Sequence, residues 1–480
     1  MAQEHVHLIG IGGTGMTSLA GLLHQAGCRV TGSDGPLYPP TSTILDSLGL
    51  ELYEGFNADN LDPVPDLIVV GNAISRGNPE VEAMLDRRLT FTSMPRIIHD
   101  RFLKDRHSIV IAGTHGKTTT SSMLAYVLKH AGRDPGYLIG GLPHDLEQPF
   151  AIGSGPAFVI EGDEYDTAYF DKGPKFMHYR PDTVLLGTVE FDHADIYKDI
   201  DQVKLAFKRL INLVPGRGRV VRYEDCDLTR EVTDGAFATV EGFGEDAGRW
   251  RAVDMQETEH GSRFSILKDD EPFATVDLGL SGAHNVRNAL SVAAAADEQG
   301  LSPQEIAAGL TTFRGVRRRF ELRGEAAGVS VYDDFAHHPT AIEETMRAVK
   351  RRFPNGRSWA ILEPRSWSLR RNVFQDRLAE VFDAADEVII APVFRADLVP
   401  DGKALDVEML TAAVAARGPN ARQLADASTI ASCVAKEARP GDVVVVMSNG
   451  GFDGLHERLL EQLEAVGATT TESRSESVGP

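Results

Sequence analysis

Short apolar runs alternate with segments of helical periodicity along most of the chain. Near its start, apolar runs at 6–9, 30–34 and 67–70 predict strands, and the pattern at 16–26 predicts a helix between the first two. Strands that alternate with helices are typical of parallel sheets in α/β proteins. The first hundred residues are therefore expected to form one such unit.

The same alternation continues through the rest of the chain. An apolar run at 108–112 precedes a helical pattern at 121–128, and further strands are predicted at 157–160 and 183–186. A polar, β-rich stretch covers about 236–278, and a helix is expected over 285–299. Later strands are predicted at 329–332, 359–362, 387–390 and 442–447.

Changes in this pattern indicate the domain boundaries. We predict an α/β protein with three domains, at residues 1–106, 107–318 and 319–466. A length of 480 residues fits that number of domains. The last residues, 467–480, are rich in Thr, Ser and Glu, which predicts a disordered tail.

Composition narrows the functional class. The net charge of −21 argues against non-specific binding to nucleic acid or to anionic membranes. The three cysteines have no metal-ligand spacing and suggest no disulfide framework. The first residues lack the features of a signal peptide, and no apolar stretch is long enough to span a bilayer. We therefore expect a cytoplasmic protein with no membrane insertion.

One segment carries the strongest chemical signal. A strand, a glycine turn, a lysine, hydroxyl residues and a helix follow one another, which is the layout of a phosphate-binding loop. The residues are Gly113, Thr114, His115, Gly116, Lys117, Thr118 and Thr119. The usual spacing places a glycine where this chain has Ile111, so a glycine-rich turn of an unrelated α/β protein stays possible on this segment alone.

Acidic and histidine residues follow the next two predicted strands. Glu161 ends the strand before an acidic turn, and His193 lies near Glu190, Asp192 and Asp195. Ligands of α/β sheets gather at the carboxyl ends of strands, and carboxylates beside a phosphate loop suit Mg²⁺. The alternatives are a solvated acidic turn and a structural histidine.

A second glycine-rich turn follows the first predicted strand. Its spacing fits the dinucleotide-binding fingerprint, with an acidic residue about 20 positions later. The residues are Gly10, Gly12, Gly13, Thr14, Gly15, Met16 and Asp34. This turn alone also permits a nicotinamide-dependent oxidoreductase.

The later part of the chain holds four further polar segments. His284 and Asn288 share one helix face and could bind a base, although Asn285 could simply cap that helix. Other candidates are Arg319 in an arginine run, Asp334 and His338 in a segment that also holds His337, and Arg365 after a strand. Neighbouring histidines point apart, so His337 and His338 are not expected to share one metal ion.

These segments, in this order, resemble the Mur ligases, the ATP-dependent amide-forming enzymes of bacterial peptidoglycan metabolism. The resemblance runs from about residue 5 to about residue 465, and residues 113–119 match the ATP loop of the family despite Ile111. It implies a Rossmann-type N-terminal domain for a UDP substrate, a central P-loop ATPase-type domain and a Rossmann-like C-terminal domain. It also implies that ATP and Mg²⁺ are required.

Two branches of the family match parts of the chain. Residues 10–16 look like the branch that adds L-alanine to UDP-N-acetylmuramate. Several segments are more similar to the branch that attaches the recycled murein tripeptide L-alanyl-γ-D-glutamyl-meso-diaminopimelate, namely 163–172, 190–195, 333–341, 363–366 and 448–452. We therefore expect tripeptide ligation, with L-alanine ligation as the alternative. A non-catalytic UDP-sugar sensor would be expected to have a damaged ATP loop.

The resemblance also implies individual roles. Lys117 would neutralise phosphate oxygens, Thr118 and Glu161 would hold one Mg²⁺, and His193 would help to hold a second. His284 and Asn288 would contact adenine and Asp334 the ribose. Arg319, His338 and Arg365 would contact phosphate or the incoming peptide. Thr188 stands where the family usually has Asn, and no lysine carbamylation is assigned to Lys204 or Lys208.

Overall fold

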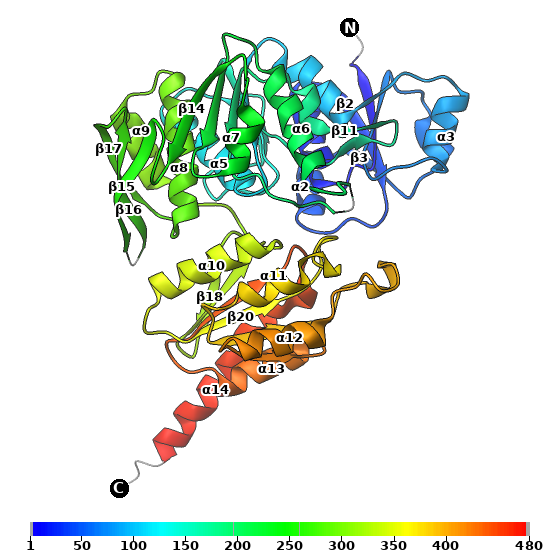
Figure 1. Cartoon of the computed structure of the whole chain (residues 1–480). Helices are drawn as coiled ribbons and strands as arrows, with labels where there is room; N and C mark the ends of the chain where they lie inside the picture. The colour runs from blue at the N-terminus through cyan, green and yellow to red at the C-terminus, as the bar shows by residue number, and fades with distance from the viewer. Residues whose placement is uncertain (1–2, 195, 259, 477–480) are drawn as a thin grey trace.

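The computed structural model describes residues 3–194, 196–258 and 260–476, so Asp195 lies outside the described residues. Three sheets with flanking helices form three successive bodies (Figure 1). The third body, in yellow to red, lies beneath the first two in this view, and helix α10 faces them.

The first sheet is parallel throughout and has the order β3-β2-β1-β4-β5. Its strands are β1 (His5–Ile9), β2 (Arg29–Asp34), β3 (Glu51–Glu54), β4 (Leu67–Val70) and β5 (Phe91–Ser93). Its helices are α1 (Thr14–Gln25), α2 (Thr41–Leu48), α3 (Pro79–Asp86) and α4 (Met94–Ile98). All five residues of β1 are buried, as expected for a strand covered on both faces.

The second sheet has ten strands in the order β17-β16-β15-β14-β13-β12-β6-β9-β7-β8. Strands β6 (His107–Ala112), β9 (Ala157–Glu161) and β12 (Thr183–Leu186) are neighbours, with β6 in the middle. The loops that follow these three parallel strands therefore leave the same edge side by side, although 75 residues of sequence separate the starts of β6 and β12.

The remaining elements extend this sheet and cover it. Its other strands are β7 (Gly136–Leu138), β8 (Phe150–Ala151), β13 (Arg219–Tyr223), β14 (Thr239–Gly244), β15 (Trp250–Thr258), β16 (Gly261–Lys268) and β17 (Glu271–Leu278). A separate hairpin pairs β10 (Asp166–Ala168) with β11 (Asp171–Pro174). The helices are α5 (Lys117–His130), α6 (Ile200–Leu213), α7 (Asp227–Thr233), α8 (Ala283–Glu298) and α9 (Pro303–Thr312).

The third sheet has the order β18-β19-β23-β20-β21-β22, with β18 antiparallel to β19. Its strands are β18 (Glu321–Ala326), β19 (Val329–Asp334), β20 (Ser358–Leu362), β21 (Glu387–Ile390), β22 (Asn420–Gln423) and β23 (Val443–Met447). Its helices are α10 (Pro339–Arg352), α11 (Gln375–Glu380), α12 (Val407–Ala416), α13 (Ala427–Glu437) and α14 (Leu455–Glu476). The loops after β19, β23 and β20 are again neighbours.

Two observations differ from or qualify the expectations. The expected tail begins inside α14, which continues to Glu476, and residues 477–480 lie outside the described residues. The polar β-rich stretch forms the antiparallel strands β15, β16 and β17 at one edge of the second sheet. Among the residues that the structure describes, no helix has both the length and the apolar character needed to cross a membrane.

Hydrogen bonds join the second and third bodies. Thr340 Oγ1 donates to Glu190 Oε2 at 2.6 Å, and Ser368 Oγ donates to Asp192 Oδ1 at 2.9 Å. Arg371 donates to the carbonyl of Ala194 at 3.0 Å. The carboxyl ends of the two sheets are thereby held face to face.

Candidate active site between the three bodies

The loop between β6 and α5 requires glycine at two positions. Gly113 and Gly116 have φ angles of 120° and 78°, in the region that favours glycine. A Cβ atom on Gly116 would lie 2.6 Å from Oδ1 of Asn288, and one on Gly113 would lie 3.0 Å from the backbone nitrogen of Gly187. The loop backbone therefore packs closely against α8 and the end of β12. No side chain among the described residues caps the start of α5, so its N–H groups are available to an anion.

Lys117 contacts both the loop backbone and a carboxylate that follows β9. Its Nζ donates to the carbonyl of Gly113 at 2.7 Å and forms an ion pair with Glu164 at 2.8 Å. Burial by itself would lower the pKa of Lys117, but the Glu164 carboxylate raises it above its ordinary value. Lys117 is therefore a fixed cation beside the loop, and Glu164 holds it in place.

Glu161, Thr118 and Ser121 form a buried oxygen cluster at the start of α5. Oγ1 of Thr118 donates to Glu161 Oε2 at 3.2 Å, and the backbone N–H of Gly140 donates to Oε1 at 2.6 Å. Ser121 Oγ adds a donation at 3.3 Å. Burial raises the pKa of Glu161, although the Gly140 N–H and the charges of Lys117 and Arg319 oppose this shift. Hard oxygen donors in this position fit Mg²⁺.

The segment after β12 packs beside this cluster. His193 has a φ angle of 53°, and its Nε2 lies 4.0 Å from Glu164 Oε2 and 4.0 Å from Asp192 Oδ2. Its ring also stacks at a tilt on Tyr165, with 4.3 Å between the ring centroids. His193 lines the same cavity as Lys117 and Thr118.

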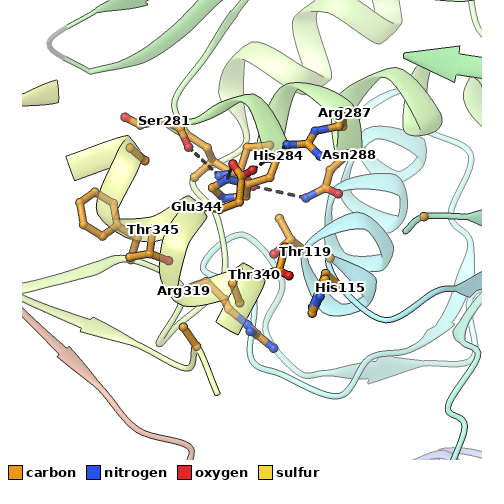
Figure 2. Close-up of a pocket in the computed structure, with 18 of the residues that line it drawn as sticks. His115, Thr119, Ser281, His284, Arg287, Asn288, Arg319, Thr340, Glu344 and Thr345 are labelled. Atoms are coloured by element: carbon orange, nitrogen blue, oxygen red, sulfur yellow. Dashed lines mark hydrogen bonds and ion pairs between the residues drawn. The ribbon is translucent and has the colours of Figure 1, made fainter. Parts of the chain in front are cut away.

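A pocket between α8 and α10 lies on the other side of the loop (Figure 2). His115, Gly116 and Thr119 come from the loop and α5, and His284 and Asn288 come from α8. In Figure 2, Arg287 and Glu344 lie beside His284. Nη2 of Arg287 donates to Glu344 at 3.3 Å, and His284 Nδ1 lies 3.7 Å from the same carboxylate. Phe243, Leu280 and Val316 add apolar lining to these polar groups. A mostly apolar pocket with a few polar groups suits a nucleobase.

Arg319 and Asp334 form the floor of this pocket. Burial lowers the pKa of Arg319 and raises that of Asp334, and each of these charges opposes the shift of the other. The Asp334 carboxylate accepts the backbone N–H groups of Phe320 and Ala336, each at 2.7 Å. Asp334 therefore ties the segment after Arg319 to the loop after β19 and keeps one face toward the pocket.

The N-terminal glycine turn borders the same cavity as the loop between β6 and α5. Asp34 Oδ2 accepts the backbone N–H of Gly12 at 2.7 Å, and α1 begins at Thr14 without a side-chain cap. Thr14 and Gly15 line a cavity of about 410 Å³ together with Lys117, Thr118, Glu161 and His193. A ligand held by the N-terminal turn can therefore extend to the loop between β6 and α5.

A separate polar pocket opens beside His193. It is lined by Tyr165, Asp192, His193, His337, Arg365, Ser366, Trp367, Ser368, Arg370 and Asn449. The guanidinium of Arg365 lies 3.7 Å from the ring centroid of Phe394, and that of Arg370 lies 5.2 Å from it. Burial and the neighbouring Arg365 lower the pKa of Arg370. Two cations held side by side in this way favour an anionic ligand.

His338 and His337 face different surroundings. His338 Nε2 donates to the carbonyl of Phe191 at 3.2 Å, and its Nδ1 accepts the backbone N–H of Thr340 at 3.3 Å. His337 lines the polar pocket, whereas His338 does not. Burial lowers the pKa of both to about 4.

The structure therefore brings together the residues predicted from the ATP loop, the two acidic segments, α8 and the third body. Several neighbours were not predicted as site residues. These are Glu164, Glu190, His337, Glu344 and Asn449. Glu164 and Glu190 lie in the acidic segments that follow predicted strands, and this signal could have found them. The resemblance gave a role to His338 and none to His337.

Family models cover most of the chain. The Mur ligase family catalytic domain matches residues 5–103, the Mur ligase middle domain matches 111–296, and the Mur ligase glutamate ligase domain matches 318–450. The matched regions follow the three sheets of the structure.

Full-length relatives agree with these matches. The chain is 44% identical over 460 residues to the UDP-N-acetylmuramate–L-alanyl-γ-D-glutamyl-meso-2,6-diaminoheptandioate ligase of Escherichia coli K12, covering 95% of this chain and 98% of the relative. A murein peptide ligase structure from Psychrobacter arcticus has a TM-score of 0.72 at 38% identity, covering 96% and 99%. A UDP-N-acetylmuramate–alanine ligase structure from Thermotoga maritima has a TM-score of 0.79 at 25% identity, covering 96% and 99%.

Proposed function

The chain belongs to the Mur ligase family, and we propose that it joins UDP-N-acetylmuramate to the recycled tripeptide L-alanyl-γ-D-glutamyl-meso-diaminopimelate, with ATP as co-substrate. The observation that carries this proposal is the shared cavity that joins the N-terminal turn to the ATP loop. It gives a UDP-sugar bound at the turn a path to the transferring phosphate.

The proposed reaction has two steps. The carboxylate of UDP-N-acetylmuramate attacks the γ-phosphate of ATP, which gives an acyl phosphate and ADP. The amine of the tripeptide then attacks the acyl carbon, and phosphate leaves. Neither step needs a covalent bond to the protein, so the protein acts by positioning and by neutralising charge.

The residues present fit these tasks. Lys117 faces the cavity as a fixed cation and would neutralise phosphate oxygens, with Glu164 orienting it. Thr118 and Glu161 would hold Mg²⁺, and His193 lines the same cavity as a further ligand. Bound there, Mg²⁺ would offset the charge on the transferring phosphate.

The pocket of Figure 2 would hold the adenosine of ATP. His284 and Asn288 lie at its base-binding end, and Asp334 lies where the third body closes the pocket. Because residues of both bodies line this pocket, bound ATP would favour the docked arrangement.

The polar pocket would hold the incoming peptide. Arg365 and Arg370 supply two cations for the carboxylates of a tripeptide, and His337 lines the pocket beside them. His338 also lines the cavity of about 410 Å³ that joins the N-terminal turn to Lys117, so we propose it as a contact for the reacting groups. L-Alanine has only one carboxylate, so it would pair less completely with the two arginines than a tripeptide does.

An acceptor panel tests the proposal. Phosphate release is measured with UDP-N-acetylmuramate, ATP and either L-alanine, the tripeptide or the tetrapeptide. The tripeptide should give the highest kcat/KM. A clear preference for L-alanine would instead select the alternative activity, which is also the activity of relatives 32% identical to this chain. Tight binding of a nicotinamide nucleotide, or UDP-sugar binding without turnover, would contradict both ligase activities.

A further inference from the structure

Three metal-binding side chains meet where the second and third bodies dock. They are His115 in the ATP loop, Glu190 after β12 and His338 before α10. One ligand atom from each residue lies within 4.8 Å of the other two. Within the described part of the chain this is the one group of three or more His, Cys, Asp or Glu side chains with that geometry.

The distances suit a small ion. His115 Nε2 lies 3.4 Å from Glu190 Oε2, and His338 Nδ1 lies 3.7 Å from the same oxygen. Metal–ligand bonds of about 2.0–2.2 Å in a tetrahedral site place ligand atoms about 3.3 Å apart. Small side-chain rotations would therefore bring the three atoms to the distances that an ion needs.

The surrounding hydrogen bonds leave the ligand atoms suitably prepared. The N–H of His338 Nε2 points at the Phe191 carbonyl, so Nδ1 is the nitrogen with the free lone pair of electrons. That lone pair accepts the backbone N–H of Thr340 at 3.3 Å and lies 3.7 Å from Glu190 Oε2, so a bound metal would replace this long hydrogen bond. His115 Nε2 is buried and has no hydrogen-bond partner among the described residues. Thr340 Oγ1 donates to Glu190 Oε2 and orients the carboxylate.

We propose that His115, Glu190 and His338 form a binding site for a divalent transition metal of the zinc type. Two imidazoles and one carboxylate favour Zn²⁺, Co²⁺ or Ni²⁺, whereas Mg²⁺ prefers oxygen ligands. The site is distinct from the oxygen cluster of Thr118 and Glu161. His115 and His338 also line the central cavity, so a fourth ligand position can face solvent.

The three ligand residues come from two bodies, so a bound metal would also hold these bodies together. His115 and Glu190 belong to the second body, and His338 begins α10 of the third. A metal bound to all three residues stabilises the docked arrangement by its binding free energy. Zinc should therefore raise the melting temperature of the protein.

Co²⁺ provides a direct probe of the site. The full-length protein is saturated with Mg²⁺ and titrated with Co²⁺ without substrates, while the visible spectrum is recorded. One equivalent of Co²⁺ should give the absorption of a low-symmetry nitrogen–oxygen site. Zn²⁺ should displace this absorption and raise the melting temperature.

Three variants localise the signal. His338→Asn keeps an acceptor at the start of α10 but removes the imidazole, and Glu190→Gln keeps the size of the side chain. Loss of a hydrogen bond to a metal ligand typically lowers metal affinity by roughly 10- to 100-fold. Each of these variants removes a ligand itself, so each should lower the Co²⁺ affinity by more than that. His193→Asn is the matched control, because Asn tolerates the positive φ at that position, and it should keep the signal.

The outcomes separate clearly. Loss of the Co²⁺ spectrum and of the zinc-dependent melting shift in His338→Asn and Glu190→Gln, but not in His193→Asn, supports the site. Absence of binding by the wild type, unchanged binding in the first two variants, or loss only in His193→Asn would overturn it. None of these measurements depends on the ligation reaction.

Discussion

Replacing Lys117 by Met should affect stability and catalysis through two separable routes. In the structure, Lys117 Nζ pairs with Glu164 at 2.8 Å, and the side chains are only 16% and 4% exposed. Removing one partner of a buried ion pair costs about 3–5 kcal/mol, because the remaining charge is left without compensation. The residual exposure of Lys117 places the expected loss near the lower end, at about 3 kcal/mol.

The double variant Lys117→Met with Glu164→Gln separates the two effects. It removes the uncompensated carboxylate, so most of the lost unfolding free energy should return. Catalysis should not return, because the transferring phosphate still lacks its cation. The loss of a group that acts on developing charge corresponds to about 10³-fold or more in rate.

Two assays test this reasoning. Urea unfolding gives the free energy of unfolding of the wild type, both single variants and the double variant. Phosphate release at saturating substrates gives kcat for the same proteins. The reasoning is refuted if the double variant regains near-normal turnover, or if Lys117→Met is as stable as the wild type while still losing activity. The first result would contradict the proposed role of Lys117 as a cation on the transferring phosphate. The second would contradict the expected contribution of the Lys117–Glu164 ion pair to the free energy of unfolding.

Three further predictions follow from other parts of the site. Gly12→Ala should raise the KM for UDP-N-acetylmuramate more than that for ATP. Its Cβ would lie 2.4 Å from Leu37 Cδ2 and 2.9 Å from Asp34 Oδ2, the oxygen that accepts the Gly12 N–H in the turn; equal effects on both KM values would contradict this. Arg365→Ala should raise the KM for tripeptide by about 10- to 100-fold. The native Arg371 side chain donates to the Ala194 carbonyl, so Arg371→Ala should change this KM much less. Similar kinetics in both variants would contradict the proposed role of Arg365 in peptide binding. Burial alone would raise the pKa of Glu344, but His284 and Arg287 lower it to about 2. The carboxylate therefore stabilises the fold above pH 4.5 by about 3 kcal/mol or less, and the stability gap to Glu344→Gln in urea unfolding should narrow to roughly half by pH 3. A gap independent of pH would refute this.

The main local elements of this protein could be predicted from the sequence alone. Continuous apolar runs such as 108–112 and 443–447 correspond to buried strands, because both faces of a parallel sheet are covered. The glycines of the loop at residues 113–119 were predictable for a local reason, since a turn with positive φ disfavours any other residue. The strand-end rule likewise pointed to Glu161 and to the segment around His193.

Side-chain partners that are distant in sequence were decided only by the tertiary structure. Glu164 meets Lys117 because β6 and β9 are neighbours in one sheet. Thr340 meets Glu190 across 150 positions because two sheets present their carboxyl ends to each other. Local sequence specifies the dihedral angles of a turn, but it carries no information about which distant side chain will fill the space beside it. For that reason the pattern of the chain itself did not separate His337 from His338, and only the family resemblance gave a role to His338. In the folded chain, one faces the polar pocket and the other faces His115 and Glu190.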